Sequence, residues 1–191
     1  SSRPPKDPYQ LETPGAAPLK ISHGTTTVAM LFDWGIVAAV DSRASMGSYV
    51  GSRTTMKVIP LTRRIVGTMA GGAADCTFWL RNLGMELKLL EIRNGQGVTV
   101  KTAATMLANT LHGLKGRGLS VGTMVMGVDQ FGPGLFYVDS EGARVQGRCF
   151  AVGSGSTYAY SVLDAEHRPD MTPEEAAELG RRAVRHATYR D

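Results

Sequence analysis

Three residues in the first third of the chain have types that suit nucleophilic catalysis. Thr25 opens the run "TTT", Asp41 closes the strand-like run "IVAAVD", and Lys57 opens the strand-like run "KVI". A lysine that points inward from a strand is costly unless it is paired, and Asp41 is the obvious partner. We therefore expect a buried Lys57–Asp41 pair near Thr25, where the cation would lower the pKa of the threonine hydroxyl and of a free amine.

Thr25 would supply its own base if it stood at a free N-terminus. An α-amine has a pKa of about 7.7 to 8.0 and takes the hydroxyl proton near neutral pH. The Gly24–Thr25 bond must first break, and Gly24 leaves its carbonyl open to attack because it has no side chain. The structural alternative is a strand start at Thr25, a turn cap at Asp41 and a strand-end lysine with its head in water.

Other chemistries have little support in the sequence. It contains no GxGxxG, GxxxxGK[ST], HExxH or GxSxG motif, and its four histidines fall at no metal-ligand spacing. Cys76 and Cys149 do not form a CxxC motif, and two cysteines are too few for a disulfide framework. We expect no cofactor and no metal.

The composition favours one soluble globular domain. The chain has 191 residues, of which 42% are hydrophobic and 20% charged, with a net charge of +4. Its densest basic group, Arg181, Arg182, Arg185 and His186, lies beside glutamates on an expected helix and is typical of a solvated face. Because no basic face with stacking aromatics and no membrane-length apolar run is present, we expect neither nucleic acid nor a membrane as partner.

The periodicity predicts a leader followed by an α+β domain. Residues 1–24 hold five of the nine prolines and have no periodicity. Apolar residues at helical spacing predict helices at 73–95 and 99–116, and a capping box (Thr172, Glu175) predicts a helix start at Pro173. Alternating or β-branched runs predict the strands at 25–32, 36–42, 56–61, 63–72, 120–128, 135–140 and 149–156. The expected order is strands, two helices, strands and one helix.

Many segments in order carry a family resemblance. "HGTTTVAM", "AVDSRAS", "GTMAGGAADC", "KGRGLSVGTM" and "GPGLFYVDSEG" resemble the proteasome beta type-5 subunits, which are chymotrypsin-like threonine peptidases of the N-terminal nucleophile hydrolase family. The resemblance covers residues 22–191. It implies a four-layer αββα sandwich of two antiparallel sheets flanked by helices, with a propeptide at 1–24 and a threonine peptidase domain at 25–191 that lacks the family's C-terminal part.

The resemblance also assigns roles to individual residues. It implies that Thr25 is the nucleophile, that Asp41 and Lys57 activate it, and that the Gly71 N–H stabilises the oxyanion. It implies that Ser154 and Asp191 support the amine of Thr25 and that the bond after Gly24 is the one processed. It also implies a pocket for the substrate side chain, lined by Ala44, Ser45, Thr55, Met69 and Ala73. Thr55 stands where the family usually has valine and Ser45 where it usually has threonine, which predicts a modest shift in preference. From the residues alone, each pocket position would be assigned to core packing.

The implied function is that of a catalytic beta subunit of the 20S proteasome core, without a cofactor, cleaving after large apolar residues. With residues 1–24 attached, the chain would be the inactive precursor. Implied partners are the other alpha and beta subunits in stacked seven-membered rings, assembly chaperones and unfolded polypeptides, in the cytoplasm and nucleus. Two alternatives stay open: a noncatalytic subunit of the same ring, and an N-terminal nucleophile amidase for small substrates or the simpler bacterial relative of the proteasome.

Overall fold

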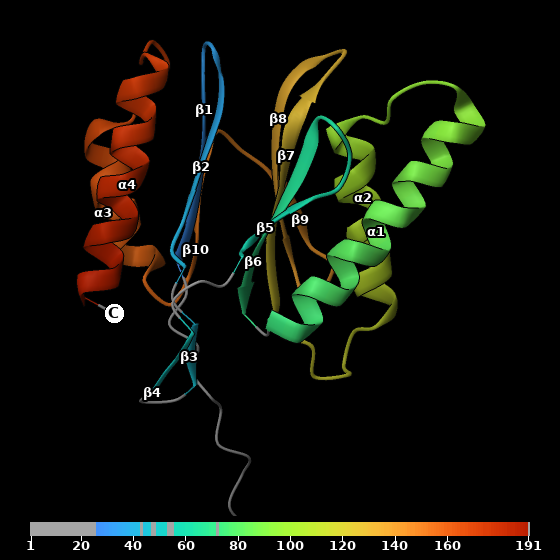
Figure 1. Ribbon diagram of the computed structural model, residues 1–191, viewed down its shortest axis with the longest axis horizontal. Coiled ribbons are helices and arrows are strands. Elements are labelled where there is room, and N and C mark those ends of the chain that lie inside the picture. The colour runs from blue at the N-terminus through green and yellow to red at the C-terminus, as the bar shows by residue number, and fades with distance from the viewer. Residues whose placement is uncertain (1–25, 43, 47–48, 53–55, 72, 191) are drawn as a thin grey trace, which may run out of the picture.

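Four layers make up the molecule in the computed structural model, which describes residues 26–42, 44–46, 49–52, 56–71 and 73–190 (Figure 1). Two sheets lie face to face, and each has a pair of helices on its outer face. All strand pairs are antiparallel. The α+β class and the αββα sandwich expected from the sequence are confirmed.

The first sheet has three strands in the order β10-β1-β2. Their bounds are β1 Thr26–Phe32, β2 Gly35–Val40 and β10 Cys149–Gly153. β1 is central and buried on both faces: Val28 and Met30 pack toward the outer helices, whereas Ala29 packs toward the second sheet. The hairpin of β1 and β2 is the one that the sequence predicted.

The second sheet has five strands in the order β5-β6-β7-β8-β9. Their bounds are β5 Val58–Pro60, β6 Ile65–Gly71, β7 Val121–Asp129, β8 Gly132–Asp139 and β9 Arg144–Gln146. Met124, Met126 and Leu135 are buried against Ala29 of the first sheet and close the interface between the sheets. A separate short hairpin consists of β3 Ala44–Met46 and β4 Tyr49–Ser52.

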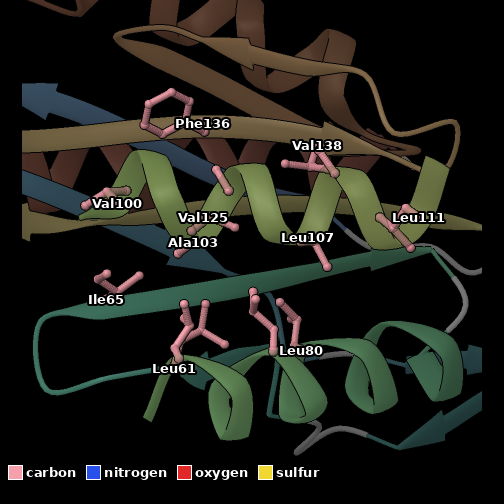
Figure 2. Close-up of a cluster of buried hydrophobic side chains, with 14 of the residues drawn as sticks. Leu61, Ile65, Leu80, Val100, Ala103, Leu107, Leu111, Val125, Phe136 and Val138 are labelled. Carbon is pink, nitrogen blue, oxygen red and sulfur yellow. The ribbon is translucent and has the colours of Figure 1, made fainter. Parts of the chain in front are cut away.

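Helices α1 (Ala73–Asn94) and α2 (Val100–Gly113) cover the second sheet. Leu80 of α1 and Leu107 of α2 face Ile65 and Val125 of the strands in one cluster of buried side chains (Figure 2). Both helices were predicted, although α2 ends at Gly113 and not at Gly116. Gly116 instead takes a φ of 83° in the following turn, a conformation that glycine adopts readily.

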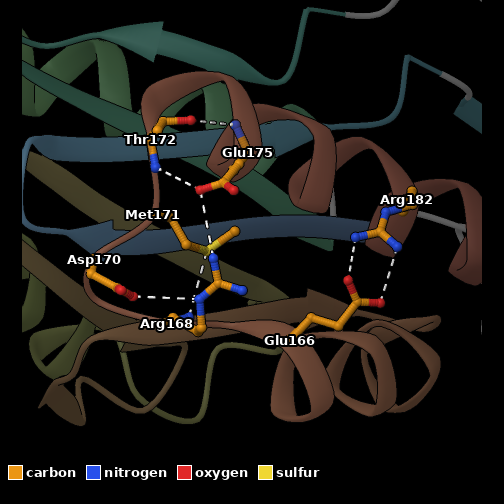
Figure 3. A network of polar contacts seen from close by, with 7 residues as sticks. All are labelled: Glu166, Arg168, Asp170, Met171, Thr172, Glu175 and Arg182. Carbon is orange, nitrogen blue, oxygen red and sulfur yellow. Dashed lines mark hydrogen bonds and ion pairs between the residues drawn. The ribbon is translucent and has the colours of Figure 1, made fainter.

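Helices α3 (Ser156–Glu166) and α4 (Pro173–Arg190) cover the first sheet. The predicted capping box is confirmed: the Thr172 N–H donates to Glu175 Oε2 at 2.9 Å, and the Glu175 N–H donates to Thr172 Oγ1 at 3.2 Å (Figure 3). Exposed ion pairs join Arg182 to Glu166 and Arg181 to Glu178. The basic residues of α4 therefore form the solvated face that we expected.

The prediction was wrong for α3. The sequence analysis assigned Ser156 to a strand and expected no helix in the residues that follow it. Its sequence "STYAYSVLDAE" is rich in β-branched and aromatic residues, and its buried residues are only Ala159 and Leu163. Two buried positions give too weak a helical period to detect. The helix is stabilised by packing against α4 and the first sheet, which the sequence does not reveal locally.

Candidate active site

A buried ion pair joins the two sheets. Asp41 directly follows β2 of the first sheet, and Lys57 directly precedes β5 of the second sheet. Lys57 Nζ donates to Asp41 Oδ1 at 2.5 Å, and the side chains are only 4% and 10% exposed. The predicted pairing of these two residues is confirmed. Because both charges have left water, the pair is stable only while each charge keeps its partner.

The same carboxylate holds the start of β1. The Thr26 N–H donates to Asp41 Oδ1 at 3.3 Å, and the Asp41 N–H donates to the Thr26 carbonyl at 3.3 Å. Asp41 therefore bonds at once to the lysine and to the peptide group that follows Thr25 in the chain. Thr25 itself, like Gly24, Thr55 and Asp191, lies outside the described residues.

Ser154 lies in the turn between β10 and α3, and this turn is next to the start of β1. Gly153 is the register partner of Thr26, and the following Gly155 approaches the Thr26 hydroxyl closely. The structure thus brings the turn that carries Ser154 to the strand end that the Asp41 carboxylate holds. Its predicted role in supporting an amine stays a prediction.

Strand β6 ties two further predicted residues to Lys57. The Met69 N–H donates to the Lys57 carbonyl at 2.9 Å, and Gly71 is the last residue of the same strand. Met69 is buried among the side chains between the second sheet and its helices, and its Sδ accepts a hydrogen bond from the Thr77 hydroxyl at 2.9 Å. This burial agrees with the core-packing alternative, and a role in a substrate pocket stays a prediction.

The remaining predicted pocket residues are placed by their backbone alone. Ala44 and Ser45 belong to β3, and Ala73 is the first residue of α1. Two hollows lined by described residues lie elsewhere. One, of about 590 Å³, is lined by the β5–β6 turn, the end of α1 and the β7–β8 turn, and the other, of about 320 Å³, lies beside it. Both are at the opposite end of β6 and β7 from Gly71.

Neither cysteine competes as a nucleophile. Cys76 is buried, and its thiol donates to the Ala70 carbonyl at 3.5 Å. Burial, and to a smaller extent the Asp164 carboxylate, raises the pKa of the Cys149 thiol to about 11. This thiol is protonated near neutral pH, whereas nucleophilic cysteines are thiolates. A hydroxyl nucleophile therefore has no rival of this kind in the described part of the chain.

Metal binding has no support among the residues that the structure describes. They contain no group of three or more His, Cys, Asp or Glu side chains that could hold a metal ion. The described helices were also searched for one long and apolar enough to cross a membrane, and none qualifies.

Three contacts of this region were missed by the sequence analysis. They are the Thr26 N–H on Asp41, the Thr77 hydroxyl on Met69, and the close approach of Gly155 to Thr26. Each joins residues of different elements, and no local pattern indicates either of the two hydrogen bonds. The only local signal was the tight "GSGS" turn, in which a glycine often marks a close approach of two backbones.

Comparisons with known proteins agree with this geometry. The family model described as "Proteasome subunit" matches residues 21–191. Proteasome subunit beta type-5 of Spinacia oleracea is 56% identical over 91% of this chain and 64% of its own length, and that of Gallus gallus is 55% identical over 91% and 68%. Proteasome subunit beta type-8 of Homo sapiens is 49% identical over 91% and 63%. The chain thus spans about two thirds of the length of these relatives.

Proposed function

The chain belongs to the proteasome subunit family, and from this premise we propose that it is the threonine endopeptidase of a 20S proteasome core. In this proposal Thr25 is the nucleophile, exposed by cleavage of the Gly24–Thr25 bond, and the enzyme cleaves polypeptides after large apolar residues. One observation carries the proposal: the buried Lys57 is bonded to Asp41, and the Asp41 carboxylate also accepts from the N–H of the peptide group directly after Thr25. A purely structural subunit has no need for a buried charge pair at this place.

The proposed reaction has two halves. The Thr25 hydroxyl attacks a peptide carbonyl and passes its proton to the Thr25 amine. The Lys57 cation stabilises the negative charge that develops on the Thr25 oxygen as the proton leaves. The C–N bond then breaks, the leaving amine takes the proton, and an ester to Thr25 remains. Water, deprotonated by the amine that Ser154 and Asp191 would support, hydrolyses this ester and restores the hydroxyl.

The backbone N–H of Gly71 is assigned to the oxyanion in both halves, a contribution of about 3 kcal/mol to the barrier. Its place at the end of β6 supports this assignment, because the same strand holds the Lys57 carbonyl through Met69. Attack of Thr25 on the Gly24 carbonyl in the same chain would free the amine. Until then Thr25 is an amide and has no base of its own, so the unprocessed chain is proposed to be inactive.

The apolar preference is proposed from the wall that Met69, Ala44, Ser45, Ala73 and Thr55 would form. Met69 is the only one of these five residues whose side chain the structure describes; its thioether is apolar, as the proposal requires, and its burial agrees equally with core packing. Its Sδ is held by the Thr77 hydroxyl, which limits how far the side chain can turn. A large apolar side chain before the cleaved bond suits such a wall.

Assembly with other alpha and beta subunits in stacked rings is proposed on the exposed face of α1. Four large apolar side chains follow one another along this helix at spacings of seven, four and three residues and are 55–70% exposed: Phe78, Met85, Leu89 and Ile92. A row of exposed large apolar side chains along one helix favours an interaction surface. We place the assembled enzyme in the cytoplasm and nucleus, with assembly chaperones as partners of the precursor.

Thr25→Ala tests the proposal. In the full-length protein, purified with its partner subunits, this change should abolish both removal of residues 1–24, read by intact mass, and hydrolysis of a fluorogenic peptide with a large apolar residue before the cleaved bond. Thr25→Ser keeps a hydroxyl and should retain both. Thr105→Ala on α2 is the matched control and should leave both at the level of the unchanged protein.

Two results would contradict the proposal. Peptide hydrolysis at an unchanged rate by the Thr25→Ala protein would exclude Thr25 as the nucleophile. Leader removal at an unchanged rate in that variant, in subunits free of other proteases, would exclude self-processing.

A further inference from the structure

We propose that Gly155 is a positioning residue for the Thr25 site: its lack of a side chain lets the turn that carries Ser154 pack directly on Thr26. The inference rests on the proposed function, because it concerns how the start of β1 is held against Asp41 and Lys57. It adds a residue to the site that acts through its neighbours and touches no substrate.

The evidence is the space around Gly155. A Cβ placed on this glycine would lie 2.4 Å from the Thr26 hydroxyl oxygen and 2.9 Å from the Ala187 Cβ of α4. Both distances are far shorter than the contacts of real methyl groups, so an alanine at this position would displace its neighbours. The backbone of Gly155, with φ −84° and ψ 9°, is open to other residues. The glycine is therefore required for space and not for conformation.

Thr26 has little freedom to move away. It is 1% exposed, and a β-branched side chain has few staggered positions to choose from. Its N–H bonds to the Asp41 carboxylate, and its register partner is Gly153 at the start of the same turn. A side chain at position 155 would thus press on the residue that connects Thr25 to the buried ion pair.

The consequence is a precise spacing between two segments that are distant in sequence. The Ser154 turn and the start of β1 are in direct contact at Gly155, and Thr26 of β1 is bonded to Asp41, which is bonded to Lys57. A shift of about 1 Å in a reacting group lowers a catalytic rate by about 100-fold. Gly155→Ala should therefore lower kcat by this factor and change KM little.

The test compares the effect of Gly155→Ala in three forms of the full-length, assembled protein: with Thr26 unchanged, with Thr26→Val and with Thr26→Ala. Valine keeps the shape of threonine and therefore the clash, whereas alanine removes the atom that clashes. We expect kcat for the apolar fluorogenic peptide to fall about 100-fold in the first two forms. In the third it should fall less than about tenfold relative to the Thr26→Ala parent.

Ala187 provides a second comparison. The three pairs are repeated with Ala187→Gly, which removes the short contact with the Ala187 Cβ of α4 and leaves the contact with Thr26. The same dependence on the residue at position 26 should remain. Gly113→Ala is the matched control, since a Cβ at Gly113 would meet no atom within 4 Å, and should leave kcat unchanged.

The outcomes separate this inference from the proposed function. If hydrolysis by the parent proteins does not require Thr25, the proposed function fails. If it does require Thr25, but Gly155→Ala changes kcat equally in all three forms or in none, only the role of Gly155 is overturned. Recovery by Ala187→Gly alone would assign the clash to α4 and would also overturn it.

Discussion

Two ion pairs of this molecule differ in almost every physical respect. Lys57–Asp41 lies between the sheets with side chains 4% and 10% exposed, whereas Arg182–Glu166 lies between α4 and α3 with side chains 49% and 42% exposed (Figure 3). An exposed pair contributes about 0 to 1 kcal/mol, since water solvates its partners equally well apart. A buried pair often contributes no more to the free energy of unfolding than apolar residues in its place would. Removing only one of the two charges is nevertheless costly, because the other charge is left buried without a partner. The comparison gives the buried pair little net value for stability, which agrees with the chemical role that we propose for it.

Breaking the buried pair should have the largest effect. Lys57→Met leaves the Asp41 charge without its partner, and we expect the free energy of unfolding to fall by about 3 to 5 kcal/mol. Peptide hydrolysis should be lost as well. Denaturant unfolding and a peptidase assay on the same preparation measure both. A loss below about 1 kcal/mol would mean that Asp41 is as well solvated as an exposed carboxylate. That result would contradict the difference between the buried and the exposed ion pair.

Removing both charges should separate stability from activity. The double variant Asp41→Asn with Lys57→Met keeps an oxygen for the Thr26 N–H but buries no charge. We expect it to regain more than half of the stability lost in Lys57→Met and none of the peptidase activity. Recovery of activity together with stability would show that the pair serves only the fold.

The Cys149 thiol extends the comparison to a group that the fold keeps neutral. Its pKa is about 11, against an ordinary value of 9.0, because burial disfavours the thiolate. The unfolded chain therefore loses this proton first, so the stability that the neutral thiol contributes is complete below pH 9 and is lost as the pH rises toward 11. Thermal unfolding of the unchanged protein and of Cys149→Ala between pH 8 and 11 measures this, and the fall should be shallower in the variant.

Breaking the exposed pair should have the smallest effect. Arg182→Ala should change the free energy of unfolding by less than about 1 kcal/mol, and raising the salt concentration should shrink the difference further. Denaturant unfolding at low and high ionic strength checks both. A loss comparable to that of Lys57→Met would remove the contrast between the two pairs.

The sequence was sufficient for the features that rest on local patterns. The β1–β2 hairpin, helices α1 and α2 and the capping box of α4 follow from periodicity and capping residues. The pairing of Lys57 with Asp41 followed from a different argument, namely that a buried lysine needs a carboxylate. The cost of burying an unpaired charge thus predicted a contact between distant residues that hydrophobic periodicity does not indicate.

The features that the sequence did not predict depend on neighbours from other elements. Helix α3 has only Ala159 and Leu163 as buried positions, so its sequence shows too little helical periodicity to identify it. Packing against α4 stabilises the helix, and the local sequence does not reveal that contact. The Thr26 N–H on Asp41 and the contact of Gly155 with Thr26 are set by how the strands and the β10–α3 turn meet. Fractions of an ångström decide such contacts, and residue types do not encode them.

The apolar stripe along α1 has a consequence for how the protein must be produced. A chain whose Phe78, Met85, Leu89 and Ile92 stand in water while it waits for a neighbour will adhere to other copies of itself. If the subunits proposed as partners cover this helix, synthesis in excess of them should favour precipitation, whereas balanced co-expression should keep the protein soluble.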